Sequence, residues 1–364
     1  MVSLTILLHK LAWSFNQSSS MQKKRITIYD IAKELSLSPS YVSKALNDHP
    51  SINDAAREKV KQKAKELNYK HNSLAANLRN GSSKTIGVIV PAINQRFFSD
   101  VIAGIEEKCN QEGHSLIICQ SLESFELECK AIDTLIRQNV DCILISVSSQ
   151  TKTMEHLLNA QVHDISLIQF DRCMEDIQGI KVLNNTFDSA YKATKAMIDA
   201  GYKSIAFLGG PAHIETFSQR KAGFLKAIEE AEMLIPYVYI NENVLPMEEA
   251  KKMADKLLSS KLPPDAFLTV SDHQALGVME SAEKLGISIP KDLGLFGFAN
   301  EDFSALVKPG LSSVDQMSKQ LGISAASAYF EHKKSHSGTS MPDEVIYVDC
   351  ELRIRDSINR GSKG

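Results

Sequence analysis

The side chains with the clearest chemical potential lie in one stretch near the N-terminus, residues 27–47 (TIYDIAKELSLSPSYVSKALN). In its second half, apolar side chains recur at helical spacing and leave the remaining ones on the opposite face. This outward set supplies hydroxyls, a phenol and an ammonium group, and it consists of Pro39, Ser40, Tyr41, Ser43 and Lys44. Such groups are typical of DNA contacts in a groove.

Two short helices must position this set. Thr27 and Asp30 have the spacing of an N-cap pair, which starts a first helix. The apolar positions of that helix are Ile28, Ile31, Ala32 and Leu35. After a break, Ser38 and Pro39 are typical of the N-cap and first residue of a second helix. The pattern predicts a helix-turn-helix, whose second helix fits the major groove of B-DNA. From this stretch alone, a helical corner without a ligand is the alternative.

Charge is unevenly distributed along the chain. The formal net charge is −3, but residues 1–84 hold 14 Lys/Arg and 6 Asp/Glu, a net +8, so residues 85–364 carry −11. A basic N-terminal part on an acidic body indicates that the N-terminal part meets a polyanion.

The sequence lacks the motifs that are typical of metal sites, enzymes and membrane-spanning segments. The six cysteines form no C-x-x-C and no His/Cys cluster of zinc-finger spacing, which favours scattered thiols in a reducing cytosol. GxSxG, P-loop, GxGxxG and HExxH motifs are absent, so we expect no enzyme, no metal and no cofactor. No apolar run approaches the ~20 residues of a membrane span.

The first twenty residues, MVSLTILLHKLAWSFNQSSS, are apolar but lack a basic n-region and a cleavage site. We interpret residues 1–25 as an extension that is either disordered or the product of a mis-assigned start, with translation beginning at Met21. A native extension is the alternative.

A third helix and a short linker follow the helix-turn-helix. Asn53 is typical of an N-cap for a helix over residues 54–67, which completes a small DNA-binding domain over residues 26–71. Residues 72–79 (NSLAANLR) are helix-compatible but too short to be stable alone in water. Residues 72–81 are therefore a tether or a hinge helix that folds on DNA, with Leu78 as an apolar wedge.

From residue 84 onward, short apolar runs alternate with amphipathic segments. The expected strands are residues 85–90, 115–120, 142–147, 166–170, 179–183, 204–208, 266–270, 294–298 and 345–348. The expected helices are residues 99–112, 126–139, 189–200, 220–230, 248–259 and 274–285. This alternation predicts an α/β body with buried parallel sheets.

About 280 residues exceed what one such sheet needs, so we expect two doubly wound parallel-sheet lobes with a ligand cleft between them. This body would span 84–364. Lobe 1 would cover about 84–185 and 315–340, and lobe 2 about 186–314 and 341–364.

The chain resembles the LacI/GalR family of bacterial transcription regulators over about residues 26–358. The resemblance rests on residues 27–47, the run AAREKVKQKAKELNYKHNSLAANLRNGSSKTIGVIVP, RFFSDVIAGIEE, FDR (170–172), GYKSIAFLGGP, RKAGFLKAI, SDHQALGVMESAEKLGISIPKDLGLFGFAN (271–300), LSSVDQ (311–316) and ELRIRDS. It implies a homodimer whose heads bind a near-palindromic operator in double-stranded DNA. It also implies that residues 84–364 are a periplasmic-binding-protein-like body, an effector-binding and dimerisation domain that couples a small effector to DNA affinity.

The resemblance assigns roles in the head. The family's base-reading positions fall on Pro39, Ser40 and Lys44, and because proline has no side-chain donor, Ser40 and Lys44 are the polar readers. Leu78 matches the hinge leucine that wedges into a central CG step, and His71 stands where the family often has proline. The further residues expected at DNA are Thr27, Tyr41, Ser43, Asn47 and Asn72.

The resemblance also assigns a cleft. Phe97 and Phe98 match positions suited to stacking on a sugar or base. Asp171 and Arg220 match charged ligand-contacting positions, and Gln316 matches a crossover residue that faces the cleft. A structural Asp171–Arg220 ion pair and core phenylalanines are the alternatives.

Two departures in the cleft leave the identity of the effector open. Ser271 and Asp272 stand for the family's usual Asn-Asp pair, and Ala299 stands where an aspartate often follows Gly-Phe or Gly-Tyr. We expect a sugar or sugar metabolite.

The sequence thus predicts a cytoplasmic DNA-binding regulator, a repressor, whose partners are operator DNA, a small effector and a second copy of the chain, but no membrane. A solute-binding receptor would share the body, but it would lack the basic head and would carry a credible signal peptide.

Overall fold

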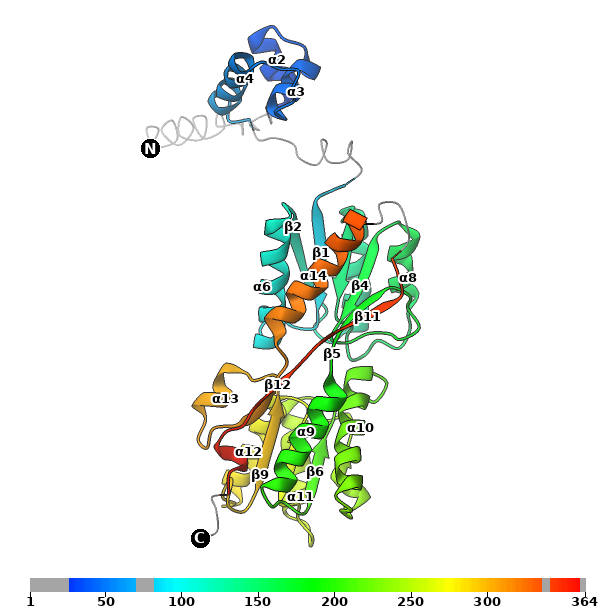
Figure 1. The fold of residues 1–364 in the computed structure, drawn as a ribbon, viewed down its shortest axis with the longest axis vertical. Helices are drawn as coiled ribbons and strands as arrows, with labels where there is room; N and C mark the ends of the chain where they lie inside the picture. The colour runs from blue at the N-terminus through cyan, green and yellow to red at the C-terminus, as the bar shows by residue number, and fades with distance from the viewer. Residues whose placement is uncertain (1–25, 70–81, 336–340, 361–364) are drawn as a thin grey trace, which may run out of the picture. The chain divides into compact units, whose positions relative to one another are not determined.

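The computed structural model describes residues 26–69, 82–335 and 341–360. These residues form two compact units, one within residues 1–80 and one within residues 81–364 (Figure 1). We call the described parts of these units the head and the body. The predictions for residues 1–25, Met21, His71, Asn72 and Leu78 lie outside the described residues.

The head contains α2 (Ile28–Leu35), α3 (Pro39–Leu46) and α4 (Asp54–Glu66). The predicted caps are present: the Thr27 backbone N–H and hydroxyl donate to Asp30 Oδ2 at 2.8 and 2.7 Å. Ser38 Oγ accepts from the Tyr41 N–H at 3.2 Å, and Asn53 Oδ1 accepts from the Ala56 N–H at 2.8 Å. These caps satisfy helix N–H groups that have no partner within the helix. The predicted helix-turn-helix is confirmed.

Apolar side chains from all three helices and the loop before α4 fill the core of the head. Its buried members are Ile31, Ala32, Val42, Ala45, Ile52, Val60 and Ala64. The helices are too short to be stable alone, so this shared core holds α3 in place.

The body contains two six-stranded sheets, one in each lobe. Sheet 1 has the order β11 (Glu344–Val348), β5 (Ile180–Asn184), β4 (Ser166–Phe170), β3 (Cys142–Ile145), β1 (Thr85–Val90) and β2 (Ser115–Gln120). Sheet 2 has the order β12 (Glu351–Arg353), β10 (Ser312–Asp315), β9 (Gly294–Phe298), β8 (Ala266–Thr269), β6 (Ile205–Leu208) and β7 (Ile240–Asn241). All neighbours pair in parallel except β10 and β12. Two parallel-sheet lobes are therefore confirmed.

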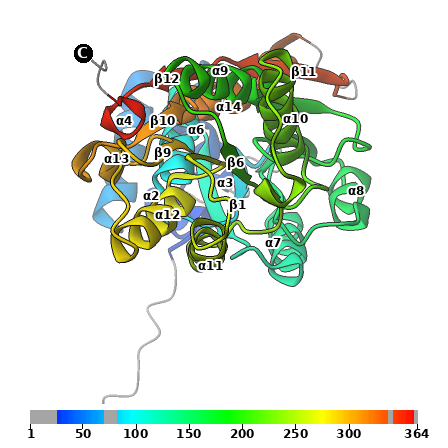
Figure 2. The same cartoon turned by 90° about the horizontal axis from the view of Figure 1, so that it is seen from below.

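Helices cover both faces of each sheet. In lobe 1, α6 (Arg96–Gln111) and α14 (Ser318–Ser335) pack together on one face, and α7 (Phe125–Arg137) and α8 (Glu155–Val162) lie on the other. In lobe 2, α9 (Thr186–Asp199) and α10 (Glu215–Glu230) cover one face, while α11 (Met247–Leu258) and α12 (Asp272–Lys284) cover the other (Figure 2). Three short helices complete the body: η1 (Tyr237–Tyr239), α13 (Asp302–Leu306) and η2 (Asp356–Ile358).

Three segments of chain connect the lobes, after β5, after β10 and after β11. The Asn184 side-chain amide donates to the backbone carbonyls of Gln316 at 2.9 Å and Val348 at 3.1 Å, so one side chain ties all three segments together. The Gln316 side-chain amide donates back to Asn184 Oδ1 at 3.2 Å. The lobes therefore share a hydrogen-bonded pivot.

One detail of the predicted body is wrong. Residues 341–348 were expected in lobe 2, but β11 pairs with β5 in sheet 1. Strand β11 covers the edge of β5, which would otherwise be unpaired. The apolar run of β11 does not by itself show which sheet the strand joins. Helix α14, which packs against α6, was not among the expected helices, and its buried residues include small ones such as Gly322, Ala325 and Ala326, which give little apolar signal. A Cβ at Gly322 would overlap the Val101 carbonyl oxygen, so this helix pair requires glycine there.

Candidate functional site: the α3 face and the interlobe cleft

Helix α3 presents a polar stripe to solvent. Ser40, Lys44 and Asn47 are exposed and lie four and three residues apart, on one side of the helix. The Asn47 amide folds back and donates to the Ser43 carbonyl at 2.8 Å. Ser40 and Lys44, one turn apart, therefore have the most freedom to reach a partner. Of the other expected DNA residues, Pro39, Tyr41 and Ser43 are half-buried and Thr27 is exposed.

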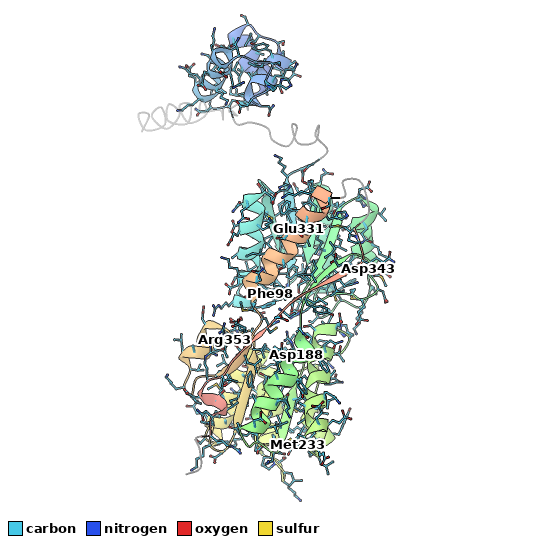
Figure 3. The ribbon with its side chains drawn as sticks, viewed as in Figure 1. Phe98, Asp188, Met233, Glu331, Asp343 and Arg353 are labelled. Atoms are coloured by element: carbon cyan, nitrogen blue, oxygen red, sulfur yellow. The ribbon has the colours of Figure 1, made fainter. Side chains whose placement is uncertain are left out.

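The body contains a cavity of about 490 Å³ between its lobes. Seven of the eight expected effector residues line it: Phe97, Phe98, Asp171, Arg220, Ser271, Ala299 and Gln316. Residues that the sequence did not point to line it as well, among them Gln95, Glu123, Ser149, Arg172, Thr216, Phe217, Asn243, Leu245, Met247, His273 and Glu301. Phe98 lies at the end of lobe 1 nearest lobe 2 (Figure 3).

Arg220 is the most unusual group in the cleft. Helix α10 carries it, and only 3% of its surface is exposed. Its Nη1 donates to the Val270 carbonyl at 2.7 Å, and its guanidinium carbon lies 4.3 Å from the centre of the Phe298 ring. Its Nε has no hydrogen-bond partner among the described residues. Burial lowers the pKa of Arg220 to about 10. Of the five N–H donors of this guanidinium, only one on Nη1 is hydrogen-bonded among the described residues, so a side chain that lines the cavity has donors left for an acceptor group of a ligand.

Asp171 faces the same cavity from lobe 1. The Ser146 hydroxyl donates to its Oδ2 at 3.2 Å, and Arg172 Nε lies 3.8 Å from the same oxygen. Burial raises the pKa of Asp171, against the opposing effects of Arg172 and Arg220. In the described structure no hydrogen bond joins Asp171 to Arg220, so the alternative of a direct structural ion pair is not what the geometry shows.

Arg172 and Glu123 form an ion pair at the cleft that sequence reasoning missed. Arg172 Nη1 lies 2.8 and 3.0 Å from the two carboxylate oxygens of Glu123, which also accepts from the Ser149 N–H at 2.7 Å. Burial would raise the pKa of Glu123, but the Arg172 charge and the Ser149 hydrogen bonds hold it below its usual range. The Arg172 guanidinium lies 5.2 Å from the Phe217 ring of lobe 2. Arg172 belongs to the FDR motif, whereas Glu123 lies in a loop with no sequence signal.

The remaining expected residues line the cavity in different ways. Phe97 and Phe98 meet edge to face at 5.0 Å, with 6% and 1% of their surfaces exposed. Ser271 caps α12, and its Oγ accepts from the Gln274 N–H at 3.2 Å, which leaves its hydroxyl hydrogen for another acceptor. Gln316 lines the cavity while its amide holds the pivot.

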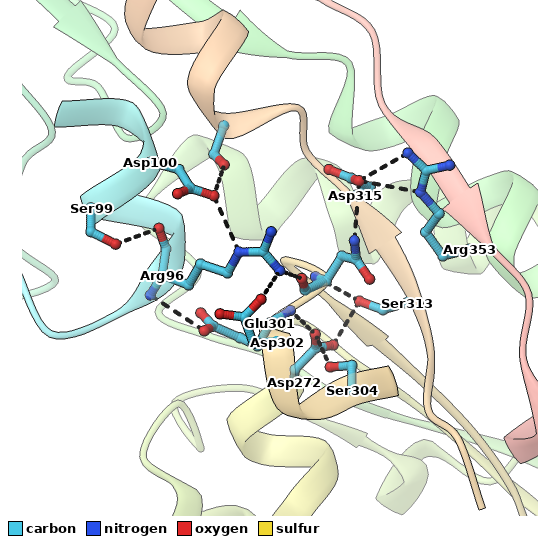
Figure 4. A network of polar contacts seen from close by, with 12 residues as sticks. Arg96, Ser99, Asp100, Asp272, Glu301, Asp302, Ser304, Ser313, Asp315 and Arg353 are labelled. Carbon is cyan, nitrogen blue, oxygen red and sulfur yellow. Dashed lines mark hydrogen bonds and ion pairs between the residues drawn. The ribbon is translucent and has the colours of Figure 1, made fainter. Parts of the chain in front are cut away.

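Asp272 is the one expected effector residue that does not line the cavity. It is fully buried, and its carboxylate accepts from Ser313 Oγ at 2.7 Å, Ser304 Oγ at 2.7 Å and the Glu301 N–H at 2.8 Å (Figure 4). Burial raises its pKa to about 7, although these hydrogen bonds oppose the shift. As the first residue of α12, it turns inward and fastens β10 and α13 to that helix.

Within the described ranges, no group of three His, Cys, Asp or Glu residues could hold a metal ion, and each of the six cysteines is free. Nor does the described part of the chain contain a helix that is both long and apolar enough to cross a membrane.

Comparisons with known proteins agree with this architecture. Residues 27–72 match the family of bacterial regulatory proteins named after lacI, and residues 194–358 match a periplasmic-binding-protein-like domain. The HTH-type transcriptional repressor PurR of Vibrio vulnificus (strain CMCP6) is 30% identical over 334 residues, which cover 92% of this chain and 99% of that protein. The PurR of Vibrio parahaemolyticus serotype O3:K6 (strain RIMD 2210633) has the same identity and coverage.

A solved structure shows the same fold. The lac repressor dimer bound to operator and the anti-inducer ONPF superimposes with a TM-score of 0.80 at 20% identity, covering 92% of this chain and 99% of that one. The helix-turn-helix head, the two-lobed body and the similarity to PurR over almost the full length together show that the chain belongs to the LacI family of bacterial regulatory proteins.

Proposed function

We propose that this chain represses transcription in the cytoplasm as a homodimer that binds a near-palindromic operator through α3, and that a small molecule in the interlobe cleft sets its affinity for DNA. One buried arginine carries the effector part of the proposal. Arg220 lines a cavity of about 490 Å³, and among the described residues only its Nη1 has a hydrogen-bond partner. Buried donors without a partner cost free energy until a ligand supplies an acceptor, which favours a binding role over a purely structural one.

The lining of the cleft suggests what kind of molecule it would hold. Arg220 and the Ser271 hydroxyl offer donors, Asp171 offers an acceptor, and Phe97, Phe98 and Phe217 offer flat apolar surfaces. A small molecule with hydroxyl or carbonyl oxygens on one side and a hydrophobic face on the other fits this pattern. We propose a sugar or sugar metabolite, bound without metal, cofactor or catalysis.

The head supports the DNA part of the proposal. Ser40 and Lys44 lie one turn apart on the exposed face of α3, which the caps and core of the head hold in place. A dimer presents two such helices, so the preferred DNA should contain two inverted half-sites.

Two independent experiments test the two parts. Selection of operators from a random double-stranded library with the full chain should enrich a near-palindrome, and a library that returns no common motif would contradict the DNA part. Thermal melting across a panel of sugars, sugar phosphates and nucleobases should identify a stabilising ligand, because a ligand of the folded state raises the melting temperature. A molecule that stabilises the wild type and Arg220→Met equally would contradict the assigned cleft.

A further inference from the structure

Arg96, at the first turn of α6 in lobe 1, makes contacts with lobe 2 beside the cleft. Its Nη1 donates to the Asn300 carbonyl at 3.1 Å and lies 2.6 Å from Asp302 Oδ1 at the start of α13. Its backbone N–H donates to Glu301 Oε2 at 3.3 Å. One residue of lobe 1 thus contacts three consecutive residues of lobe 2 (Figure 4).

The segment that Arg96 contacts is a strained wall of the cavity. Ala299 and Glu301 line the cavity, and Ala299 has a φ of +104° and Asn300 a φ of +52°. Non-glycine residues rarely adopt such values, and they persist only where the surroundings hold them. Within lobe 2, the Ala299 N–H donates to the Val314 carbonyl at 2.9 Å and the Asn300 N–H to Ser313 Oγ at 2.9 Å. The Asn300 carbonyl is held from the other lobe, by Arg96.

On the lobe 1 side, Arg96 is anchored to the paired helices α6 and α14. Arg96 Nε lies 3.2 Å from Asp100 Oδ2, and the Ser318 hydroxyl at the start of α14 donates to the same oxygen at 3.4 Å. The two helices pack backbone to backbone, because glycines at 104 and 322 let them approach. Arg96 is therefore connected to both helices through the Asp100 carboxylate.

The far end of α14 reaches the point where the chain enters the body. Lys333 Nζ lies 3.2 Å from Ser82 Oγ and 3.4 Å from Asp141 Oδ2. The Asp141 carboxylate also accepts from the backbone N–H groups of Ser83 at 2.5 Å and Lys84 at 3.1 Å. Helix α14 therefore connects the level of the cleft to the first described residues after the linker.

We propose that Arg96 is a positioning residue that fastens the cleft wall at 299–302 of lobe 2 to the α6–α14 pair of lobe 1, so that the state of the cleft is transmitted to the entry of the linker. The transmission to DNA rests on the function proposed above, whereas the fastening of the two lobes does not. The Arg96 and Asp302 side chains are 39% and 80% exposed, so the link is weak enough to break and is screened by salt.

Hydrogen exchange of the full chain, measured peptide by peptide without DNA or ligand, tests the fastening. In Arg96→Ala, amides of 299–306 should exchange about three- to tenfold faster than in the wild type, as expected for the loss of an exposed ion pair and one hydrogen bond. Asp302→Asn should accelerate the same peptide, and raising the salt concentration should narrow the difference between wild type and variants.

Two controls separate this role from a local one. Lys319→Ala removes an ion pair between α14 and Glu107 of α6 at 2.8 Å that does not cross between the lobes, so it should leave 299–306 unchanged. Peptides over β3 and β8 report global unfolding and should keep wild-type rates. The proposal is overturned if faster exchange in Arg96→Ala is confined to 94–100, or if Asp302→Asn leaves 299–306 at the wild-type rate. Because neither result needs DNA or a ligand, failure here is distinct from failure of the proposed function.

Discussion

Replacing Arg220 with methionine should separate ligand binding from stability. Methionine keeps most of the side-chain volume and a favourable contact with the Phe298 ring, but it removes the charge and the donors. Burial lowers the pKa of Arg220 from its usual range to about 10, which corresponds to a cost of about 3 kcal/mol for the charged form in the folded state. The substitution relieves that cost.

The substitution also has a destabilising effect of similar size. The Val270 carbonyl loses its partner at 2.7 Å, and a buried unpaired acceptor costs about 1–3 kcal/mol. Asp171 loses the favourable field of Arg220 but retains Arg172 Nε at 3.8 Å. We therefore expect the free energy of unfolding without ligand to change by less than about 2 kcal/mol. Hydrogen bonds from a charged donor to the ligand are worth about 1.5–3 kcal/mol each, so affinity should fall at least about tenfold.

The assay combines calorimetric titration of the ligand found by thermal melting with chemical denaturation and operator titration. Operator affinity without ligand should be unchanged, because the head is untouched. A loss of about 3–5 kcal/mol of stability would identify Arg220 as half of a structural ion pair. Unchanged ligand affinity would show that Arg220 does not contact the effector. Either result would refute the reasoning.

Three further predictions concern the head, the buried carboxyl group and a helix contact. Lys44→Ala should cost about 1–3 kcal/mol on the selected operator and little on random DNA, whereas Lys59→Ala on α4 should affect both equally; gel-shift titrations distinguish these outcomes. Because burial raises the pKa of Asp272 to about 7, the free energy of unfolding of the wild type should fall relative to that of Asp272→Asn as pH rises from about 4 to 7, by up to about 4 kcal/mol. A difference between the two proteins that does not vary over this pH range would contradict this prediction. Gly322→Ala should destabilise the body by about 2–3 kcal/mol, because the added Cβ would overlap the Val101 carbonyl oxygen. The control Gly113→Ala has open space around its Cβ but a φ of +68°, so it should cost about 1 kcal/mol. Equal melting temperatures for the two variants would refute the close helix contact.

The local elements were determined by the sequence, because the signals for them act between near neighbours. Ser38 and Pro39 predict the start of α3, because the serine cap and the proline ring act within the first turn of the helix. The continuous apolar run of β1 predicts a strand that is buried on both faces. The family motifs led to Phe97, Asp171 and Arg220, which do line one cavity. The strand-helix alternation, together with the length of about 280 residues, also predicts two lobes.

Tertiary structure decided what depends on partners distant in sequence. Asp272 follows Ser271 directly, yet it points into the protein because Ser304 and Ser313 meet its carboxylate there. Strand β11 joins sheet 1 rather than sheet 2 because β5 offers it an unpaired edge, and apolar content alone fits either edge.

The same reason explains the cleft residues that the sequence did not reveal. Glu123 becomes part of the site only because Arg172, 49 residues away, turns toward it. Arg96 begins the RFFSDVIAGIEE motif, but the motif does not reveal its contacts with the segment before α13, more than 200 residues later in the chain. Helical periodicity and capping are properties of neighbouring residues, whereas ion pairs across a cleft exist only after folding has brought distant segments together.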